Sequence, residues 1–185
     1  MRKLKSFYDS EAEFTEIHHS LKQTACPHCK RVGCLILHGF LKGYGTDCND
    51  RKIIRGHRIF CSNRYRSSGC GRTFCLLASR FIRGFVITAT VLWRFLEKLA
   101  AGFSKKTSFT ESGASCCGSG AYRLFRRVIL GQSHIRSILL RHRPAPEPPT
   151  SIQPLFATVS HLRNIFPDSP CPVSSFQSNF QVSFL

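Results

Sequence analysis

Acidic residues are scarce in this chain of 185 residues, and their scarcity decides much of what the sequence excludes. Only 10 Asp and Glu stand against 27 Lys and Arg, which gives a formal net charge of +17. Nearly all of the excess lies in residues 26–143, whereas a merely soluble basic protein would tend to carry charge in its tails as well. A positive block of this kind is typical of a surface that lies along phosphates. It argues against a protein that binds cationic partners.

Long apolar runs are also missing. No run approaches the roughly 18 residues that span a bilayer. The basic start Met1–Lys5 is followed by acids and not by the apolar segment of a secretory signal. We therefore expect no membrane partner and a cytoplasmic location. In that compartment the preferred interpretation of the ten cysteines is metal ligands or free thiols, and disulfides are the less favoured one.

Catalytic signatures are absent from the sequence as well. The ten acids are scattered, and none follows a hydrophobic strand in an α/β pattern, so no carboxylate cluster for two Mg2+ ions is evident. The chain also lacks G-x-S-x-G, a Walker loop and H-E-x-x-H. We expect a binding module and not an enzyme. A redox role for Cys26 and Cys29 is disfavoured, because short strands and not a βαβ unit surround them.

Composition divides the chain into five segments. Residues 1–25 form an acidic and aromatic lead-in, 26–86 hold most cysteines among short strand-like runs, and 87–143 show helical periodicity. Residues 144–150 are a proline-rich linker, and 151–185 form a C-terminal helical and apolar tail. The short connections of the second segment favour antiparallel pairing, because they leave no room for a crossover helix. The predicted fold class is α+β, a small antiparallel ribbon followed by a helical region.

The pair Cys26 and Cys29, in Cys26-Pro27-His28-Cys29, has the spacing at which two thiolates on one tight turn face a single Zn2+. A structural zinc site needs four ligands, and the candidates for the second pair are Cys61, Cys70 and Cys75. We predict Cys61 and Cys70, because the glycines that flank Cys70 permit the required turn. Cys75 remains the reserve ligand.

Other interpretations of these residues stay open. His28 and His57 are weaker ligand candidates, and all the cysteines could be ordinary buried thiols. Cys34 and Cys48 have no partner at metal spacing, and the vicinal Cys116 and Cys117 are interpreted as incidental. Zinc would nevertheless explain how a small, glycine-rich segment folds, since metal binding contributes on the order of 10 kcal/mol.

Basic residues surround the proposed second pair and recur in the helical half. We expect Thr88–Ala101 to be a supporting helix and residues 120–130 to be the recognition helix, ended by Gly131 and followed by a further helix, His134 to His142. A solvated helix face is the alternative for the arginines of residues 120–130. The residues predicted to contact nucleic acid are Arg55, Arg58, Arg64, Arg66, Arg72, Tyr122, Arg123, Arg126 and Arg127.

Four motifs together resemble the zinc ribbon of insertion-element transposase proteins. They are Cys26-Pro27-His28-Cys29, Leu37-His38-Gly39-Phe40, His57-Arg58-Ile59-Phe60-Cys61 and Cys70-Gly71-Arg72-Thr73-Phe74. The resemblance covers roughly residues 26–142 and implies a zinc ribbon with a helix-turn-helix that binds element-end DNA. It supports Cys26, Cys29, Cys61 and Cys70 as ligands. The chain departs from the pattern in the inserted residues 62–67 and the long hairpin 41–52.

The leading hypothesis is therefore a zinc-dependent protein that binds duplex DNA, with structural zinc and no catalytic core of its own. An RNA- or ribosome-associated zinc-ribbon protein is the first alternative, and a protein-interaction adaptor is the second. The uncharged aromatic segment Phe176–Leu185 is expected to serve docking or the formation of a homodimer.

Overall fold

The computed structural model describes residues 2–45, 52–64, 67–114, 119–146 and 154–185. The fold class is α+β, as predicted, with a small sheet and a set of helices. The chain divides into two compact units: unit 1 comprises Met1–Tyr44 with Asp50–Ser79, and unit 2 comprises Arg80–Leu185 with Gly45–Asn49. The division lies ahead of residue 86, where the sequence suggests that the ribbon ends. Within the described residues, no helix combines the length and apolarity needed to cross a membrane.

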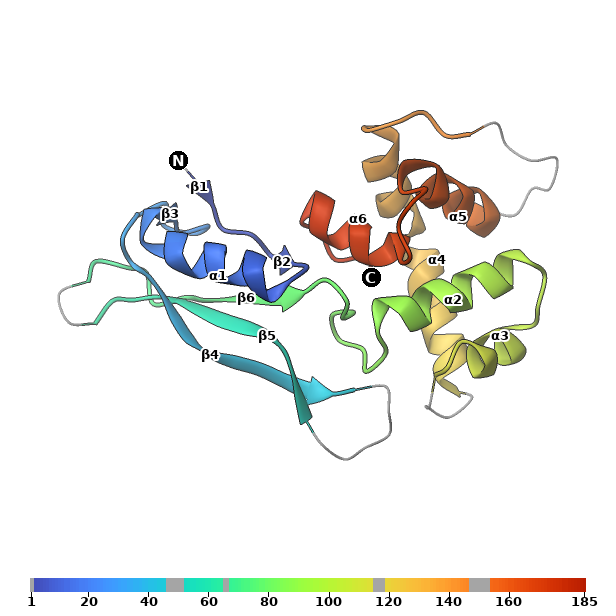
Figure 1. Ribbon diagram of the computed structural model, residues 1–185, viewed down its shortest axis with the longest axis horizontal. Helices are drawn as coiled ribbons and strands as arrows, with labels where there is room; N and C mark the ends of the chain where they lie inside the picture. The colour runs from blue at the N-terminus through green and yellow to red at the C-terminus, as the bar shows by residue number, and fades with distance from the viewer. Residues whose placement is uncertain (1, 46–51, 65–66, 115–118, 147–153) are drawn as a thin grey trace. The chain divides into compact units, whose positions relative to one another are not determined.

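A four-stranded sheet in the order β2-β6-β5-β4 forms the centre of unit 1 (Figure 1). Strands β4 (Leu35–Tyr44) and β5 (Lys52–Cys61) form an antiparallel hairpin, and β6 (Thr73–Ala78) pairs antiparallel with β5. Gly56 allows β5 to approach β6 closely, because a Cβ there would lie 2.3 Å from the carbonyl oxygen of Leu76. The sequence predicts strands over 35–40, 53–60 and 73–76, and all three lie within these elements. β4 continues through Gly43 and Tyr44, which the sequence predicts as part of the turn.

The lead-in, expected to be a separate segment, belongs to unit 1. Its elements are β1 (Arg2–Lys3), β2 (Phe7–Tyr8), α1 (Glu11–Ser20), a short 3-10 helix (Leu21–Gln23) and β3 (Thr24–Ala25). β2 pairs parallel with β6, and β1 pairs parallel with β3. Burial of both side chains of β2 explains this arrangement, since the apolar surface of the sheet needs a cover.

Helix α1 covers one face of the sheet. It begins after Ser10, whose hydroxyl accepts a hydrogen bond from the Glu13 N–H at 3.2 Å. The Phe14 ring stacks on the imidazole of His57 from β5, with the ring centroids 3.6 Å apart. His57 is therefore buried in an aromatic contact, and it takes no part in a ligand cluster.

The hairpin of β4 and β5 is longer than the strand beside it. β6 pairs with β5 only between Gly56 and Phe60, so residues 41–44 and 52–55 continue as a two-stranded ribbon. We call these residues the distal arm. A register shift between Leu41 and Lys42 marks its root.

Unit 2 begins with α2 (Ala89–Ala100) and α3 (Lys105–Glu111). The Thr88 hydroxyl caps α2 by accepting a hydrogen bond from the Val91 N–H at 3.3 Å, as its sequence position suggests. The sequence allows a helix within residues 104–120 but does not place it, because this seven-residue element buries little besides Phe109 and has no apolar period. α3 packs against α2 and α4.

Helix α4 (Ser119–Leu140) is continuous, so the prediction of two helices separated at Gly131 is wrong. Its buried side chains continue on one face past the glycine, from Leu124 and Val128 to Ile135 and Leu139. Burial of this stripe outweighs the roughly 1 kcal/mol that a glycine costs inside a helix.

The C-terminal tail lies in the core of unit 2. α5 (Pro154–Ile165) and α6 (Pro172–Phe180) both pack against α2, and the Phe176 and Phe184 side chains are fully buried. Gln177 fixes the last residues, since its side-chain oxygen accepts a hydrogen bond from the Phe184 N–H at 3.1 Å. The aromatic residues of the tail are thus used inside the unit.

Candidate metal centre

The first pair of cysteines lies on a tight turn of unit 1. The Lys30 N–H donates to the Cys26 carbonyl at 3.0 Å, and the Cys26 N–H donates to the Arg31 carbonyl at 2.9 Å. Lys30 has a φ of 62°, the left-handed conformation that folds the chain back after Cys29. The Cys29 N–H points at the Cys26 sulfur, with a separation of 3.5 Å. Both sulfurs therefore project from one turn.

The second pair joins the end of β5 to a turn nine residues later. Cys61 is the last residue of β5, and its N–H donates to the Arg72 carbonyl at 2.9 Å. The Gly71 N–H donates to the Cys61 carbonyl at 2.9 Å, with Gly71 at a φ of 71°. The Cys70 N–H lies 3.3 Å from the Cys61 sulfur. The backbone thus closes the base of the inserted loop and presents two sulfurs side by side.

The two turns bring four sulfurs together. The Sγ atoms of Cys26, Cys29, Cys61 and Cys70 all lie within 4.8 Å of one another. Cys26 Sγ is 3.7 Å from Cys70 Sγ, and Cys29 Sγ is 3.7 Å from Cys61 Sγ, so each close contact joins one turn to the other. The four cysteines are close enough to hold a metal ion.

The electrostatic surroundings of the four thiols differ. A hydrogen bond from the backbone N–H of Arg31 is the main cause that lowers the pKa of Cys29 to about 7. Burial raises the pKa of Cys61 to about 12. Cys29 thus ionises readily, whereas a buried Cys61 thiolate calls for a cation beside it.

The remaining cysteines lie elsewhere. Cys75, the reserve ligand, is exposed on β6 and is not part of the cluster. Cys34 is buried with its sulfur 3.9 Å from the Ser68 hydroxyl, and Cys171 is buried in unit 2, where burial raises the pKa of its thiol. Cys48, Cys116 and Cys117 lie outside the described residues.

The predicted nucleic-acid contacts fall in both units. Arg58, Arg64 and Arg72 are exposed in unit 1, and the Arg64 guanidinium lies 5.7 Å from the centre of the Phe60 ring. Arg55 differs, because its side chain is half-buried and burial lowers its pKa. Arg66 lies outside the described residues. Four of the predicted nucleic-acid contacts are exposed on α4 in unit 2: Tyr122, Arg123, Arg126 and Arg127.

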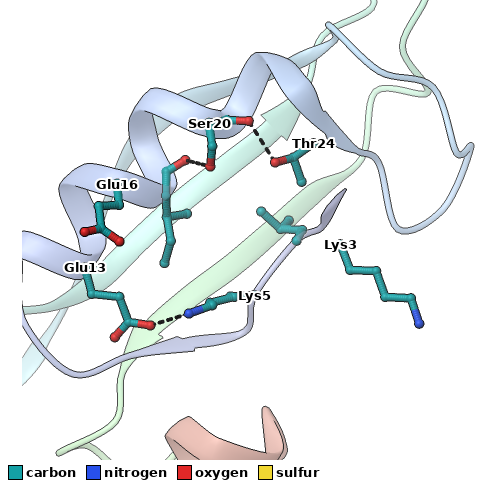
Figure 2. A pocket seen from close by; sticks show the side chains of 8 residues that line it. Lys3, Lys5, Glu13, Glu16, Ser20 and Thr24 are labelled. Atoms are coloured by element: carbon teal, nitrogen blue, oxygen red, sulfur yellow. Dashed lines mark hydrogen bonds and ion pairs between the residues drawn. The ribbon is translucent and has the colours of Figure 1, made fainter. Parts of the chain in front are cut away.

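A polar pocket between the N-terminal segment and α1 was not indicated by the sequence (Figure 2). Its volume is about 380 Å³, and a 2.6 Å ion pair between Lys5 and Glu13 lies along it. Burial raises the pKa of Glu13, but hydrogen bonds from Lys5 and from the Asp9 N–H hold that pKa below its usual value. Lys3 and Glu16 are the other two charged residues of the lining, so its two positive and two negative charges balance. The pocket therefore differs from the positively charged surfaces that carry the exposed arginines.

Searches of protein-family models, of curated proteins and of solved structures all find no match to this chain. The likeness to insertion-element proteins therefore rests on the cysteine and glycine motifs alone.

Replacing Gly69 with alanine tests the second turn. A Cβ there would lie 2.1 Å from the Ser62 carbonyl oxygen and 2.8 Å from the Cys61 sulfur, so the turn must open. We expect Gly69→Ala to weaken metal binding at least about tenfold and to cost roughly 1–3 kcal/mol of folding free energy. Competition with a chromophoric chelator and thermal unfolding measure the two effects.

Gly33→Ala is the matched control. Unlike Gly69, Gly33 has a left-handed conformation, with a φ of 83°, but a Cβ at Gly33 would meet no atom within 4 Å. This variant should lose roughly 1–2 kcal/mol of stability and keep native metal affinity. Native affinity in Gly69→Ala would contradict the role assigned to the turn.

Proposed function

We propose that this chain is a zinc-dependent protein that binds duplex DNA and is related to the DNA-binding parts of insertion-element transposases. Zinc fits the donor set, because four thiolates are a common tetrahedral site for this ion. With zinc–sulfur bonds of about 2.3 Å, the edge of the tetrahedron is about 3.8 Å. Two of the sulfur separations, both 3.7 Å, agree with that value, and all the sulfurs lie within 4.8 Å of one another.

The proposed zinc is structural. Four protein ligands fill a tetrahedral ion and leave no position for water or substrate, as is usual for structural sites. The sulfurs also connect three distant parts of unit 1, the first turn, the end of β5 and the turn at Cys70. A thiolate site of this kind suits a reducing compartment, so the proposal includes a cytoplasmic location. No reaction is assigned to the chain.

The observation that carries DNA binding is a surface of arginines without carboxylate partners. None of the ion pairs Lys5–Glu13, Lys98–Glu111 and Arg163–Glu97 includes Arg58 of β5 or the exposed arginines of α4. Unneutralised guanidinium groups gathered on exposed faces attract a polyanion and form bidentate contacts with phosphates and guanines.

Helix α4 is the proposed recognition helix. Its first turns expose Tyr122, Arg123, Arg126 and Arg127, while the opposite face packs into unit 2. The shorter α3 precedes it and is held against it by Lys105, whose ammonium lies 4.3 Å from the centre of the Phe125 ring. A short helix that packs behind the start of a longer basic helix agrees with the helix-turn-helix arrangement, in which the N-terminal residues of the second helix contact bases.

Binding of the full-length chain to duplex DNA across a salt series tests this function. The triple variant Arg123→Gln, Arg126→Gln, Arg127→Gln should weaken binding roughly 10- to 100-fold at physiological salt. The slope of log affinity against log salt should become shallower by about one for each phosphate that the variant no longer neutralises. Lys98→Gln is the control, because it removes a charge in unit 2 that Glu111 already neutralises.

Two outcomes decide between the functions. Duplex affinity that is indifferent to salt and to the triple substitution would refute the proposal. A structured RNA that displaces the duplex at equal concentration would favour the RNA-associated alternative, since competition compares the two ligands on the same protein.

A further inference from the structure

The distal arm, together with Phe40 just before it in β4, presents one face on which aromatic side chains alternate with lysines. Successive residues of a strand point to opposite sides, so Phe40, Lys42 and Tyr44 of β4 share one face. Ile54 pairs with Lys42 and Lys52 pairs with Tyr44, which places both β5 residues on that same face. We call these five residues the aromatic–lysine face.

The side chains of this face are open to solvent. The exposed fraction is 51% for Phe40, 48% for Tyr44 and 46% for Ile54. Helix α1 contacts the same face of the sheet at His57, where its Phe14 ring stacks beside Phe40. A ribbon of two strands is marginal in water by itself, so half-exposed rings at this place indicate a surface that gains a cover on binding.

The charge of the face has a single sign. Neither β4 nor β5 contains an acidic residue, and both lysines of the face are exposed. The Lys52 ammonium lies 5.8 Å from the centre of the Tyr44 ring, so the cation and the ring are presented together. A partner that offers flat apolar rings beside negative charges complements this face.

We propose that the aromatic–lysine face binds single-stranded DNA, with bases stacked on Phe40 and Tyr44 and phosphates at Lys42 and Lys52. Stacking needs an open base face, which a strand offers and a duplex does not. Along a strand the two rings lie roughly 13 Å apart, with Lys42 between them. The face offers no carboxylate or amide to select the 2′-hydroxyl of RNA. This site is separate from the duplex contacts proposed for α4.

The arm is held in place at its root. The Phe40 ring lies 5.5 Å from the His57 ring, and His57 is itself stacked on Phe14 of α1. β5 then ends at Cys61 in the sulfur cluster, so the cluster fixes the end of the strand that carries two of the five residues of the face. A rigid platform binds an unstructured strand at a lower entropic cost than a mobile loop does.

Fluorescence anisotropy of a labelled 12-nucleotide oligo(dT) with the full-length protein tests the site. Tyr44→Ala should weaken binding roughly 5- to 100-fold, and Phe40→Ala should act similarly. Tyr44→Phe keeps the ring and should bind within about twofold of the native protein. Because Tyr44 is half exposed, metal content and thermal stability should not change in Tyr44→Ala or Tyr44→Phe, whereas Phe40→Ala also removes a contact with His57.

Phe103→Ala is the matched control. Phe103 is also 48% exposed and also lies under a lysine, with the Lys98 ammonium 5.2 Å from the ring centre, but it belongs to unit 2. This variant should bind oligo(dT) as the native protein does.

Four outcomes would overturn the proposal: no binding of oligo(dT), native affinity in both Tyr44→Ala and Phe40→Ala, tighter binding of oligo(U) than of oligo(dT), or a self-associated mass that Tyr44→Ala abolishes. The last would assign the face to a second copy of the chain. Duplex binding that survives Tyr44→Ala leaves the function proposed for α4 intact, so the two proposals can fail separately.

Discussion

Removing the metal is expected to unfold unit 1 while unit 2 stays folded. The sulfurs of Cys26, Cys29, Cys61 and Cys70 come from three separate segments at that end of the sheet, and without a cation the buried thiolates would be left uncompensated. Zinc binding contributes on the order of 10 kcal/mol, which equals the whole stability of a typical small domain. Unit 2 has a large apolar core of its own and contains no part of the sulfur cluster.

Hydrogen exchange measured by mass spectrometry separates the two units in one experiment. After treatment with a chelator, or in Cys70→Ser, peptides from β4 and β5 should lose protection, whereas peptides from α2 and α4 should keep it. The single tryptophan, Trp93, is buried in α2, so its fluorescence should not change. Cys75→Ser is the control, since this cysteine lies outside the cluster. Full protection of β5 after chelation would contradict the structural role of the metal.

Truncating Phe176 is the second change with a large expected effect. The ring is fully buried and packs edge-to-face on Phe180 and Phe184, with centroid distances of 5.0 and 5.3 Å. Phe176→Ala should lower the free energy of unfolding of unit 2 by about 3–5 kcal/mol, because it leaves a cavity among helices α2 and α6. Urea titration followed by Trp93 fluorescence measures the change.

The same variant tests the role expected of the tail. Leu130→Ala is the control, because Leu130 is 68% exposed on α4 and its truncation should change stability by less than about 0.5 kcal/mol. If the tail formed a homodimer and not the core, Phe176→Ala would halve the mass in solution and leave the unfolding midpoint unchanged. The homodimer stays a prediction. Light scattering of the native protein and of Phe176→Ala measures the mass in solution, and urea titration of the same two proteins measures the stability.

Local signals in the sequence predicted much of the candidate site. The C-x2-C spacing of Cys26 and Cys29 fixes one turn, and the glycines on both sides of Cys70 permit the other. Cys61 was a predicted ligand because it ends a strand-like run, and the structure places it beside the other three. Turn conformations depend on a few adjacent residues, so they can be inferred without knowledge of the fold.

Tertiary packing decided what the sequence could not predict. The parallel pairing of β2 with β6 joins residues far apart in the chain, and a two-residue strand has no periodicity of its own. Gly131 is a helix-ending signal in isolation, but burial of Ile135 and Leu139 beyond it carries α4 onward. The tail has an aromatic composition that suits a docking surface and a core equally, and only the position of Phe176 distinguishes them.

The sequence shows the alternation of Phe40, Lys42 and Tyr44, but it does not show that Lys42 and Tyr44 lie beyond the end of β6. Had β6 extended further along β5, Lys52 and Ile54 would pair with a third strand, as His57 opposite Phe40 does, and there would be no two-stranded arm. Because the pairing of β6 with β5 stops at Gly56, the arm stands free in the described part of unit 1.

The metal content of the native protein, purified without added metal, tests the central claim most directly. Elemental analysis should find one zinc ion per chain in the native protein and in Cys75→Ser, and a loss of bound zinc in Cys70→Ser and Cys61→Ser. A folded native protein that contains no metal, or a Cys70→Ser variant with unchanged zinc, would contradict the assignment of these four cysteines.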